Sequence, residues 1–325
     1  MFLKNIFMKD YVADNILDIA RRNAKNVKVL SNNRYDNDNI DDENMYFKFY
    51  KNGSFDYRSK DYLRKNLLVN ILNSNITPSL RLNKDYNVII NLHDYHDNNG
   101  SLSFGAKKNN NVALIPDVYQ MENYKDSIIY GKNDEKDFNN KINKIIFCGA
   151  STGSINPEHN DRINTSIWSV KNSWAINNTY IRLNNIVQIT YENLNGYLNE
   201  RKVKLPSIMS NHISIEKQLN YKYILSIDGN TWAWDRPIWI MSSNSLFFKY
   251  ESDNVGWYYE LLKEDMHYVS VNRDNMEQKY NFFENNTNQA LEIIYNSQKF
   301  VDDYCSNEAW EFYFKSLLEE LSYLS

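Results

Sequence analysis

The sequence predicts an α/β protein with two domains facing a cleft. Short apolar segments typical of buried strands alternate with segments of helical spacing in both halves of the chain, a pattern that favours α/β domains. A length of 325 residues fits two domains of ordinary size, and a hydrophobic content of 42% supplies their cores. We expect the first domain over residues 1–135 and the second over residues 136–304.

The first half combines one clear helix with short strands. Its expected elements are, in order, a helix at 12–28, a loop at 32–43, a strand pair at 45–57 around the Asn52-Gly53 turn, a helix at 61–73, and strands at 87–92 and 112–115. The polar and charged residues 132–144 follow, and their composition predicts a linker between the domains.

The second half begins with an apolar strand near Lys144 and continues with further strands and helices. The expected elements are a mixed segment at 168–184, a strand at 222–227, a helix at 236–241, a strand at 245–249, a helix at 258–265, a strand at 267–271 and helices at 276–304. The tail repeats large apolar residues every three or four positions from Trp310 to Leu324, which predicts an amphipathic helix at 309–324.

Composition excludes several classes of protein. The net charge of −4 and the pI of about 5.8 argue against a nucleic-acid-binding surface. The two cysteines, Cys148 and Cys305, form neither a disulfide framework nor a zinc site, and they fit a reducing compartment. Apolar runs are too short for a signal-peptide core or a membrane span. These features predict a soluble, cytoplasmic protein.

The most informative segment runs from Ile145 to Gly153. It reads as a buried strand that stops at small residues, Gly149-Ala150-Ser151-Thr152-Gly153, and Arg162 follows. A strand, a small-residue turn and a helix can present backbone N–H groups and hydroxyls to a phosphate, and an arginine can neutralise a diphosphate. The segment is neither a P-loop nor a Gly-x-Gly-x-x-Gly motif. Taken alone, it is also compatible with an ordinary strand–loop–helix connection.

A second segment ends a strand at another small polar turn, Asp228-Gly229-Asn230-Thr231. Ligands of open α/β sheets bind at this end of the strands. Arg236 begins the next helix, where its guanidinium can face an anion together with the helix N-terminus. The alternative is that the neighbouring tryptophans form core and that Arg236 pairs with Asp235 or a distant carboxylate.

A third segment, His93-Asp94-Tyr95, places a carboxylate at the exit of a core strand. Asp94 can act as a general base if it faces a cleft, and Asp97 and Asp117 compete for this role. The alternative is an Asx turn that stops the strand. A metal site made of Asp94 with the two nearby histidines is disfavoured, because no further ligand of suitable spacing follows.

In their order along the chain, the three segments resemble glycosyltransferase family 90. The resemblance extends from residue 87 to the C-terminus. Asn87 to Tyr95 is similar to the Val-Ile-Asn-x-x-Asp-Tyr strand of the family, and Phe147 to Gly153 is similar to its Phe-Arg-Gly-Ser segment. Tyr221 to Phe248 looks like its nucleotide-sugar segment, and Tyr258 to Val271 looks like its closing His-Tyr-Ile-Pro-Val block.

The resemblance implies a GT-B architecture, with two Rossmann-like domains and a C-terminal helix, here residues 305–325, that returns to the N-terminal domain. It implies inverting transfer of a sugar such as glucose or xylose from a UDP-sugar to a hydroxyl of a glycan, lipid-linked or protein acceptor. Asp94 matches the catalytic base. No metal or other cofactor and no nucleic acid is expected. The implied donor-binding residues are Gly149, Ser151, Thr152, Gly153, Arg162, Asp228, Gly229, Asn230 and Arg236.

One departure from the family pattern supports an alternative function. Cys148 stands where the family usually has arginine, which removes a positive charge near the donor phosphates. This favours a non-catalytic nucleotide-sugar or glycan-binding protein, whereas Asp94 and the two arginines favour an enzyme. A phosphatase or sugar hydrolase would need paired carboxylates or a metal cluster, and the sequence presents neither convincingly.

Overall fold

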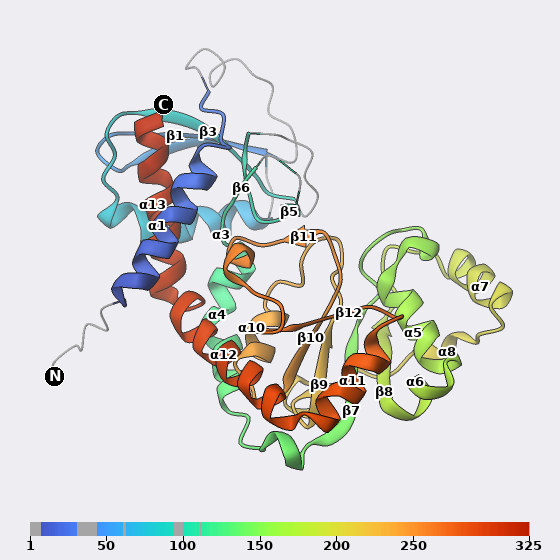
Figure 1. Cartoon of the computed structure of the whole chain (residues 1–325). Helices are drawn as coiled ribbons and strands as arrows, with labels where there is room; N and C mark the ends of the chain where they lie inside the picture. Colours follow the sequence, from blue (N-terminus) through green and yellow to red (C-terminus); the bar gives the residue numbers. More distant parts are fainter. Residues whose placement is uncertain are drawn as a thin grey trace. The chain divides into compact units, whose positions relative to one another are not determined.

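The computed structural model describes residues 8–30, 44–60, 63–93, 100–108, 110 and 112–324 (Figure 1). The chain forms two compact units, which we call unit 1 and unit 2. Unit 1 comprises Met1–Lys125, Asn254–Glu260 and Asp302–Ser325, and unit 2 comprises Asp126–Asp253 and Leu261–Val301. The domain boundary that the sequence predicts at residue 135 therefore lies inside unit 2.

Unit 2 is built on a parallel sheet of five strands in the order β12-β10-β9-β7-β8. The strands are β7 (Ile142–Ala150), β8 (Thr179–Asn185), β9 (Tyr221–Ser226), β10 (Leu246–Tyr250) and β12 (Val269–Val271). Sequence analysis predicts all of them except β8, which lies in the segment described as mixed. β8 is an edge strand whose residues alternate between buried and half-buried, so its apolar signal is weak.

Helices follow the strands, as parallel connections require. They are α5 (Asp161–Lys171), α6 (Ser173–Asn178), α7 (Tyr191–Glu200), α8 (Leu205–Ile208), α9 (Ile215–Gln218), α10 (Arg236–Met241), α11 (Met276–Asn285) and α12 (Thr287–Tyr304). Helix α4 (Val118–Lys132) precedes β7; it begins in unit 1 and ends in unit 2. Helices α5, α6 and α8 pack beside β8 (Figure 1). The core between sheet and helices is aromatic, and Tyr223 contacts both Phe248 and Tyr280 there.

The strand order of unit 2 fixes where a ligand can bind. β7 comes first in the chain but lies between β8 and β9, so the chain must cross over after β8. Such a reversal is a topological switch point, and the crevice outside the carboxyl ends of the two strands beside it is the usual ligand site of an open parallel sheet. In unit 2 these are the carboxyl ends of β7 and β9.

Unit 1 contains a mixed sheet in the order β2-β1-β3-β4-β6, in contrast to the parallel sheet of a Rossmann-like domain. β1 is antiparallel to both neighbours, and the turn at Gly53, with φ of +88°, folds β2 back on it. A second, two-stranded sheet pairs β5 with β11. The strands are β1 (Asn44–Phe49), β2 (Phe55–Arg58), β3 (Tyr86–Asn91), β4 (Leu102–Ser103), β5 (Ala106–Lys107), β6 (Ala113–Leu114) and β11 (Asn254–Val255).

The first and last helices of the chain, α1 (Asp10–Ala24) and α13 (Asn307–Leu324), pack side by side in unit 1 (Figure 1). The Asn23 amide of α1 donates a 3.0 Å hydrogen bond to the Tyr313 hydroxyl of α13. Helix α3 (Leu63–Ile71), which continues into a π-helical turn, also belongs to unit 1, as does the start of α4. Among the described residues, no helix is both long and apolar enough to cross a membrane.

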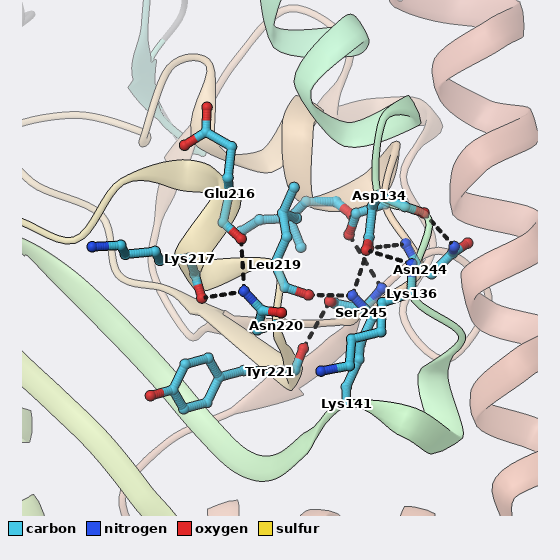
Figure 2. Close-up of polar contacts among 12 residues, drawn as sticks. Asp134, Lys136, Lys141, Glu216, Lys217, Leu219, Asn220, Tyr221, Asn244 and Ser245 are labelled. Atoms are coloured by element: carbon cyan, nitrogen blue, oxygen red, sulfur yellow. Dashed lines mark hydrogen bonds and ion pairs between the residues drawn. The ribbon is translucent and has the colours of Figure 1, made fainter.

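The polar segment 132–144 is an integral part of unit 2, so its prediction as a linker is wrong. The Lys141 ammonium and the Asp134 carboxylate form a 2.6 Å ion pair and are almost fully buried (Figure 2). Asp134 also accepts a 2.8 Å hydrogen bond from the backbone N–H of Asn244, and Lys141 donates to the carbonyl of Leu219. Two of the charges that suggest a solvated linker, Lys141 and Asp134, therefore satisfy each other inside the fold, whereas Lys132, Glu135 and Asp137 are exposed.

The prediction of a helix at 258–265 is also wrong. The segment forms only a 3₁₀ turn, Tyr259–Leu261, and then a turn in which Asp265 has φ of +57°. Its aromatic side chains pack individually instead, since the Tyr258 ring meets the Trp257 ring edge-on with 5.7 Å between centroids.

Candidate functional site

The loop after β7 is held at the switch point by its polar side chains. Ser151 is fully buried, and its hydroxyl donates to the carbonyl of Val187 at 3.0 Å and accepts from the Val187 N–H at 2.8 Å. Gly153 has φ of +135°, a conformation open to glycine, and its N–H donates to the Asn230 side chain at 3.0 Å. The Asn230 amide thus links the loop after β9 to the loop after β7.

Arg162, in the first turn of α5, bridges the ends of β7 and β9. Its Nε donates to the carbonyls of Ile227 and Asp228 at 3.0 and 3.2 Å, and its Nη1 donates to the carbonyl of Ala150 at 2.9 Å. Nη1 also contacts the Thr152 hydroxyl. This arginine therefore fixes the spacing of the two loops between which a ligand would lie.

Arg236, the first residue of α10, approaches the same strand end. Its Nη2 donates to the carbonyl of Cys148 at 2.8 Å and its Nη1 donates to the Gln218 side chain at 3.2 Å. The guanidinium carbons of Arg162 and Arg236 lie 5.6 and 5.1 Å from the centroid of the Phe147 ring. The structure thus brings both arginines named in the sequence analysis to one aromatic side chain.

The two guanidinium groups concentrate positive charge in a poorly solvated place. Burial, together with the nearby charge of Arg236, lowers the pKa of Arg162 to about 9, although Asp228 acts in the opposite direction. Burial also lowers the pKa of Arg236, and Asp235 only partly compensates. Burial raises the pKa of Asp235 itself. The site therefore favours an anion that would balance the guanidinium charges.

The turn after β9 packs directly on the turn after β7. A Cβ atom on Gly229 would lie 2.6 Å from the Thr152 hydroxyl oxygen and 3.3 Å from Arg162 Nη2, so only glycine allows this approach. The Asp228 carboxylate is nearly buried and lies 3.8 Å from the Lys249 ammonium on β10. Gly149 is packed similarly closely, since a Cβ atom added to it would lie 3.0 Å from the Phe147 ring.

Sequence analysis does not name several residues that complete this arrangement. Lys249 is the one with a usable signal, because a lysine inside the apolar strand Leu-Phe-Phe-Lys-Tyr predicts a buried charge that needs a partner. The sequence around Gln218 and Asn160 contains no such indication of a buried polar side chain. The Asn160 side chain caps α5 by accepting from the Ile163 N–H and donates to the carbonyl of Ser151 at 2.9 Å.

Asp94 lies outside the described residues, as do Asp97 and the second histidine of that segment, His96. The strand before it, β3, ends at Asn91, whose side chain accepts a 2.9 Å hydrogen bond from the N–H of His93. The competing Asp117 is fully buried. Within the part of the chain that the structure describes, no group of three or more His, Cys, Asp and Glu side chains could hold a metal ion.

Cys148, which the sequence resemblance places where an arginine is usual, does not present its side chain to solvent. The thiol is 2% exposed, and its sulfur lies 3.6 Å from the Ser210 hydroxyl and 3.8 Å from the Asn211 carbonyl. Its backbone carbonyl, however, is the acceptor for Arg236. Backbone, rather than the cysteine side chain, therefore connects this position to the site.

One curated protein and two solved structures are similar to parts of this chain. The O-glucosyltransferase LpsA of Dichelobacter nodosus is 35% identical over 99 residues, which cover 30% of this chain and 31% of that protein. The structure of TarM matches with a TM-score of 0.38 and 14% identity, covering 55% of this chain and 35% of TarM. The C-terminal domain of LpcC, a glycosyl transferase group 1 family protein from Francisella tularensis, matches with a TM-score of 0.34 and 14% identity, covering 58% and 94%.

The family comparison covers more than half of the chain. The model of glycosyl transferase family 90 matches residues 138–325, which include both arginines and both small-residue turns of the site. The chain therefore belongs to glycosyl transferase family 90.

Proposed function

We propose that unit 2 binds the diphosphate of a UDP-sugar between the loops that follow β7 and β9. One observation supports this most strongly: two half-buried guanidinium groups, Arg162 and Arg236, flank Phe147 at the switch point, and burial lowers the pKa of both although Asp228 and Asp235 lie near them. A diphosphate brings further negative charge to this place, and its oxygens can accept from guanidinium and backbone N–H donors.

The reaction we propose is a single inverting displacement. A hydroxyl oxygen of the acceptor attacks the anomeric carbon, the bond from that carbon to the diphosphate oxygen breaks, and UDP leaves with the bonding electrons. Asp94 takes the hydroxyl proton as the new bond forms. Arg162 and Arg236 stabilise the charge that grows on the leaving diphosphate. We assign these roles without a divalent metal, because the guanidinium groups supply the positive charge at the leaving group.

Glucose is the sugar that the comparisons favour, since the partly matched LpsA is named an O-glucosyltransferase. The match covers about a third of that protein. The acceptor we propose is a hydroxyl of a glycan, a lipid-linked saccharide or a protein.

The donor site is tested by titrating UDP into the wild-type chain and the Arg236→Gln variant in a calorimeter. Losing one charge-assisted contact should weaken UDP binding about tenfold or more. Arg182→Gln is the matched control, because Arg182 is a half-buried arginine of unit 2 that donates to Ser169 and Ile181. Equal UDP affinity in wild type and Arg236→Gln would show that the diphosphate does not bind beside Arg236.

Catalysis is tested separately by UDP release from UDP-glucose in the presence of a chelator. Wild type should release UDP with an acceptor present, and Asp94→Asn should lose this activity while keeping its UDP affinity. Turnover by Asp94→Asn would exclude Asp94 as the base, and dependence on an added divalent ion would exclude the metal-free mechanism. Binding of UDP-sugars with no turnover by wild type would instead identify the alternative, a non-catalytic nucleotide-sugar-binding protein.

A further inference from the structure

The Arg236 guanidinium is held by four groups of unit 2. Its Nη2 donates to the carbonyl of Cys148 at 2.8 Å, and its Nη1 donates to the side-chain oxygen of Gln218 at 3.2 Å. Its central carbon lies 5.1 Å from the centroid of the Phe147 ring and 5.4 Å from that of the Trp239 ring. Of these four groups, Gln218 is the one whose side chain accepts a hydrogen bond from the cation.

The side-chain amide of Gln218 is oriented so that its oxygen faces Arg236. Its nitrogen donates to the carbonyl of Ile213 at 2.9 Å, and a carbonyl oxygen accepts hydrogen bonds but cannot donate them. If the amide turned over, it would lose this bond and place its NH₂ group against the guanidinium. Gln218 is 3% exposed, so each lost contact would leave a buried polar atom without a partner. The Ile213 carbonyl therefore fixes the direction of the acceptor that Arg236 uses.

The segment that carries Gln218 is itself attached to the parallel sheet. Gln218 is the last residue of α9, and two residues later the chain enters β9. The carbonyl of Leu219 accepts a hydrogen bond from the buried Lys141 ammonium (Figure 2). The carbonyl of Asn220 accepts one from the Ile142 N–H at 2.7 Å. Because both donors lie where β7 begins, the backbone next to Gln218 is fixed relative to the strand that Arg236 contacts.

Gln218 holds the cation without neutralising it. A glutamate at this position would form an ion pair with Arg236, whereas an amide oxygen accepts the same hydrogen bond and carries no net charge. Gln218 and the Cys148 carbonyl each use one N–H group of the guanidinium, and Arg236 donates no further hydrogen bond within the described part of the chain. The remaining N–H groups can therefore donate to an anion.

We propose that Gln218 is a positioning residue for the donor diphosphate and that it acts through Arg236. The inference rests on the proposed function, because Arg236 is one of the two arginines that we assign to the leaving group. Donors stabilise developing charge most effectively when they are already in place before that charge appears. Gln218 keeps Arg236 in place before the UDP-sugar binds and leaves its charge for the diphosphate.

The test is a double-mutant cycle on UDP affinity, measured by calorimetry with the full chain. Gln218→Met keeps a side chain of similar length without its hydrogen bonds, and it should weaken UDP binding about threefold to tenfold. In the Arg236→Gln background the same substitution should have little further effect, since no cation remains to be positioned. Uridine, which lacks the diphosphate, should bind Gln218→Met as it binds wild type.

Gln218→Glu tests the importance of a neutral acceptor. It keeps an oxygen beside Arg236 but adds a carboxylate, so it should weaken UDP binding at least as much as Gln218→Met. Gln298→Met is the matched control and should leave UDP affinity unchanged. Gln298 is a half-buried amide of unit 2 that donates to the carbonyl of Ser243 and the side chain of Asn244, both at 3.0 Å. Thermal unfolding checks that each variant is folded.

Three results would overturn the inference while the proposed function stands. They are wild-type UDP affinity in both Gln218 variants although Arg236→Gln binds UDP more weakly, additive losses in the double-mutant cycle, and a loss of uridine affinity as large as the loss of UDP affinity. Wild-type UDP affinity in Arg236→Gln, or no UDP binding by the wild-type chain, would overturn the proposed function and this inference with it.

Discussion

Gly229 is the residue at which the two turns of the site touch. It carries no functional group, yet the Thr152 hydroxyl and the Arg162 guanidinium both occupy the space that a side chain would need. Sequence analysis names all three residues. Their mutual packing, which makes the glycine necessary, is visible only in three dimensions.

Gly229→Ala should weaken UDP binding, because the new methyl group pushes Thr152 and Arg162 out of place. Calorimetric UDP titration measures this, and the double variant Gly229→Ala/Thr152→Ala should recover part of the affinity since it removes the closest contact at 2.6 Å. Gly196→Ala is the control, because nothing lies within 4 Å of its Cβ in α7. Wild-type affinity in Gly229→Ala would show that the tight packing is irrelevant to the ligand.

His267 should make the chain less stable in mild acid. Burial, and to a smaller degree Lys263, lowers its pKa from 6.5 to about 4, and its Nδ1 accepts a 3.0 Å hydrogen bond from the Lys263 N–H. Because the unfolded chain then binds more protons, the free energy of unfolding falls as the pH drops from 6.5 towards 4.

Urea unfolding at a series of pH values measures this loss. His267→Asn keeps an acceptor for the Lys263 N–H but does not titrate, so its stability should fall less over the same pH interval. His212→Asn, which replaces an exposed histidine, is the control. Parallel curves for wild type and His267→Asn would contradict the assignment.

At the scale of elements, the buried ion pair of Lys141 and Asp134 joins the start of β7 to the residues after α4 and to the turn before β10 (Figure 2). Burial lowers the pKa of Lys141, while its hydrogen bond to Asp134 opposes this shift. The pair therefore anchors three segments of unit 2 at the edge opposite to the proposed ligand site.

Lys141→Met should destabilise the protein by about 3 kcal/mol, because it leaves the Asp134 carboxylate buried without its cation. Thermal or urea unfolding measures the change. The Lys141→Met/Asp134→Leu variant should be less destabilised than Lys141→Met alone, since no charge remains buried. Lys217→Met, at an exposed lysine, should be close to neutral. A neutral Lys141→Met would mean that the pair does not anchor this edge.

The same element shows where sequence reasoning fails. Charged residues in a row are typical of solvated linkers, and only the fold reveals that Lys141 meets Asp134 and the carbonyl of Leu219. β8 was missed for a related reason, because an edge strand needs few apolar residues. The strands β7, β9 and β10, buried on both faces, have continuous apolar sequences and were predicted.

At the scale of the whole molecule, the two ends of the chain belong to one unit. α13 buries most of its apolar face against α1 and the sheet of unit 1, where the Tyr86 hydroxyl donates to the carbonyl of Leu318 at 2.9 Å. Residues more than 200 positions apart thus form one core, and the stability of unit 1 depends on the last helix.

Leu317→Ala should lower the free energy of unfolding by about 2–5 kcal/mol, because it opens a cavity at a fully buried position of α13. Leu324→Ala, at the exposed end of the same helix, should change it by less than about 0.5 kcal/mol. Urea unfolding of both variants measures the difference. Equal effects would show that α13 does not contribute its buried face to the core.

The sequence by itself determined the α/β class, most buried strands, the amphipathic last helix and the family, because hydrophobic period and short motifs are local signals. Only the tertiary structure decided the strand order of unit 2, which creates the switch point, and the meeting of Arg162 with Arg236 at Phe147. It also decided which polar residues are buried. These properties depend on contacts between distant segments, and no local pattern records which distant residue becomes a neighbour.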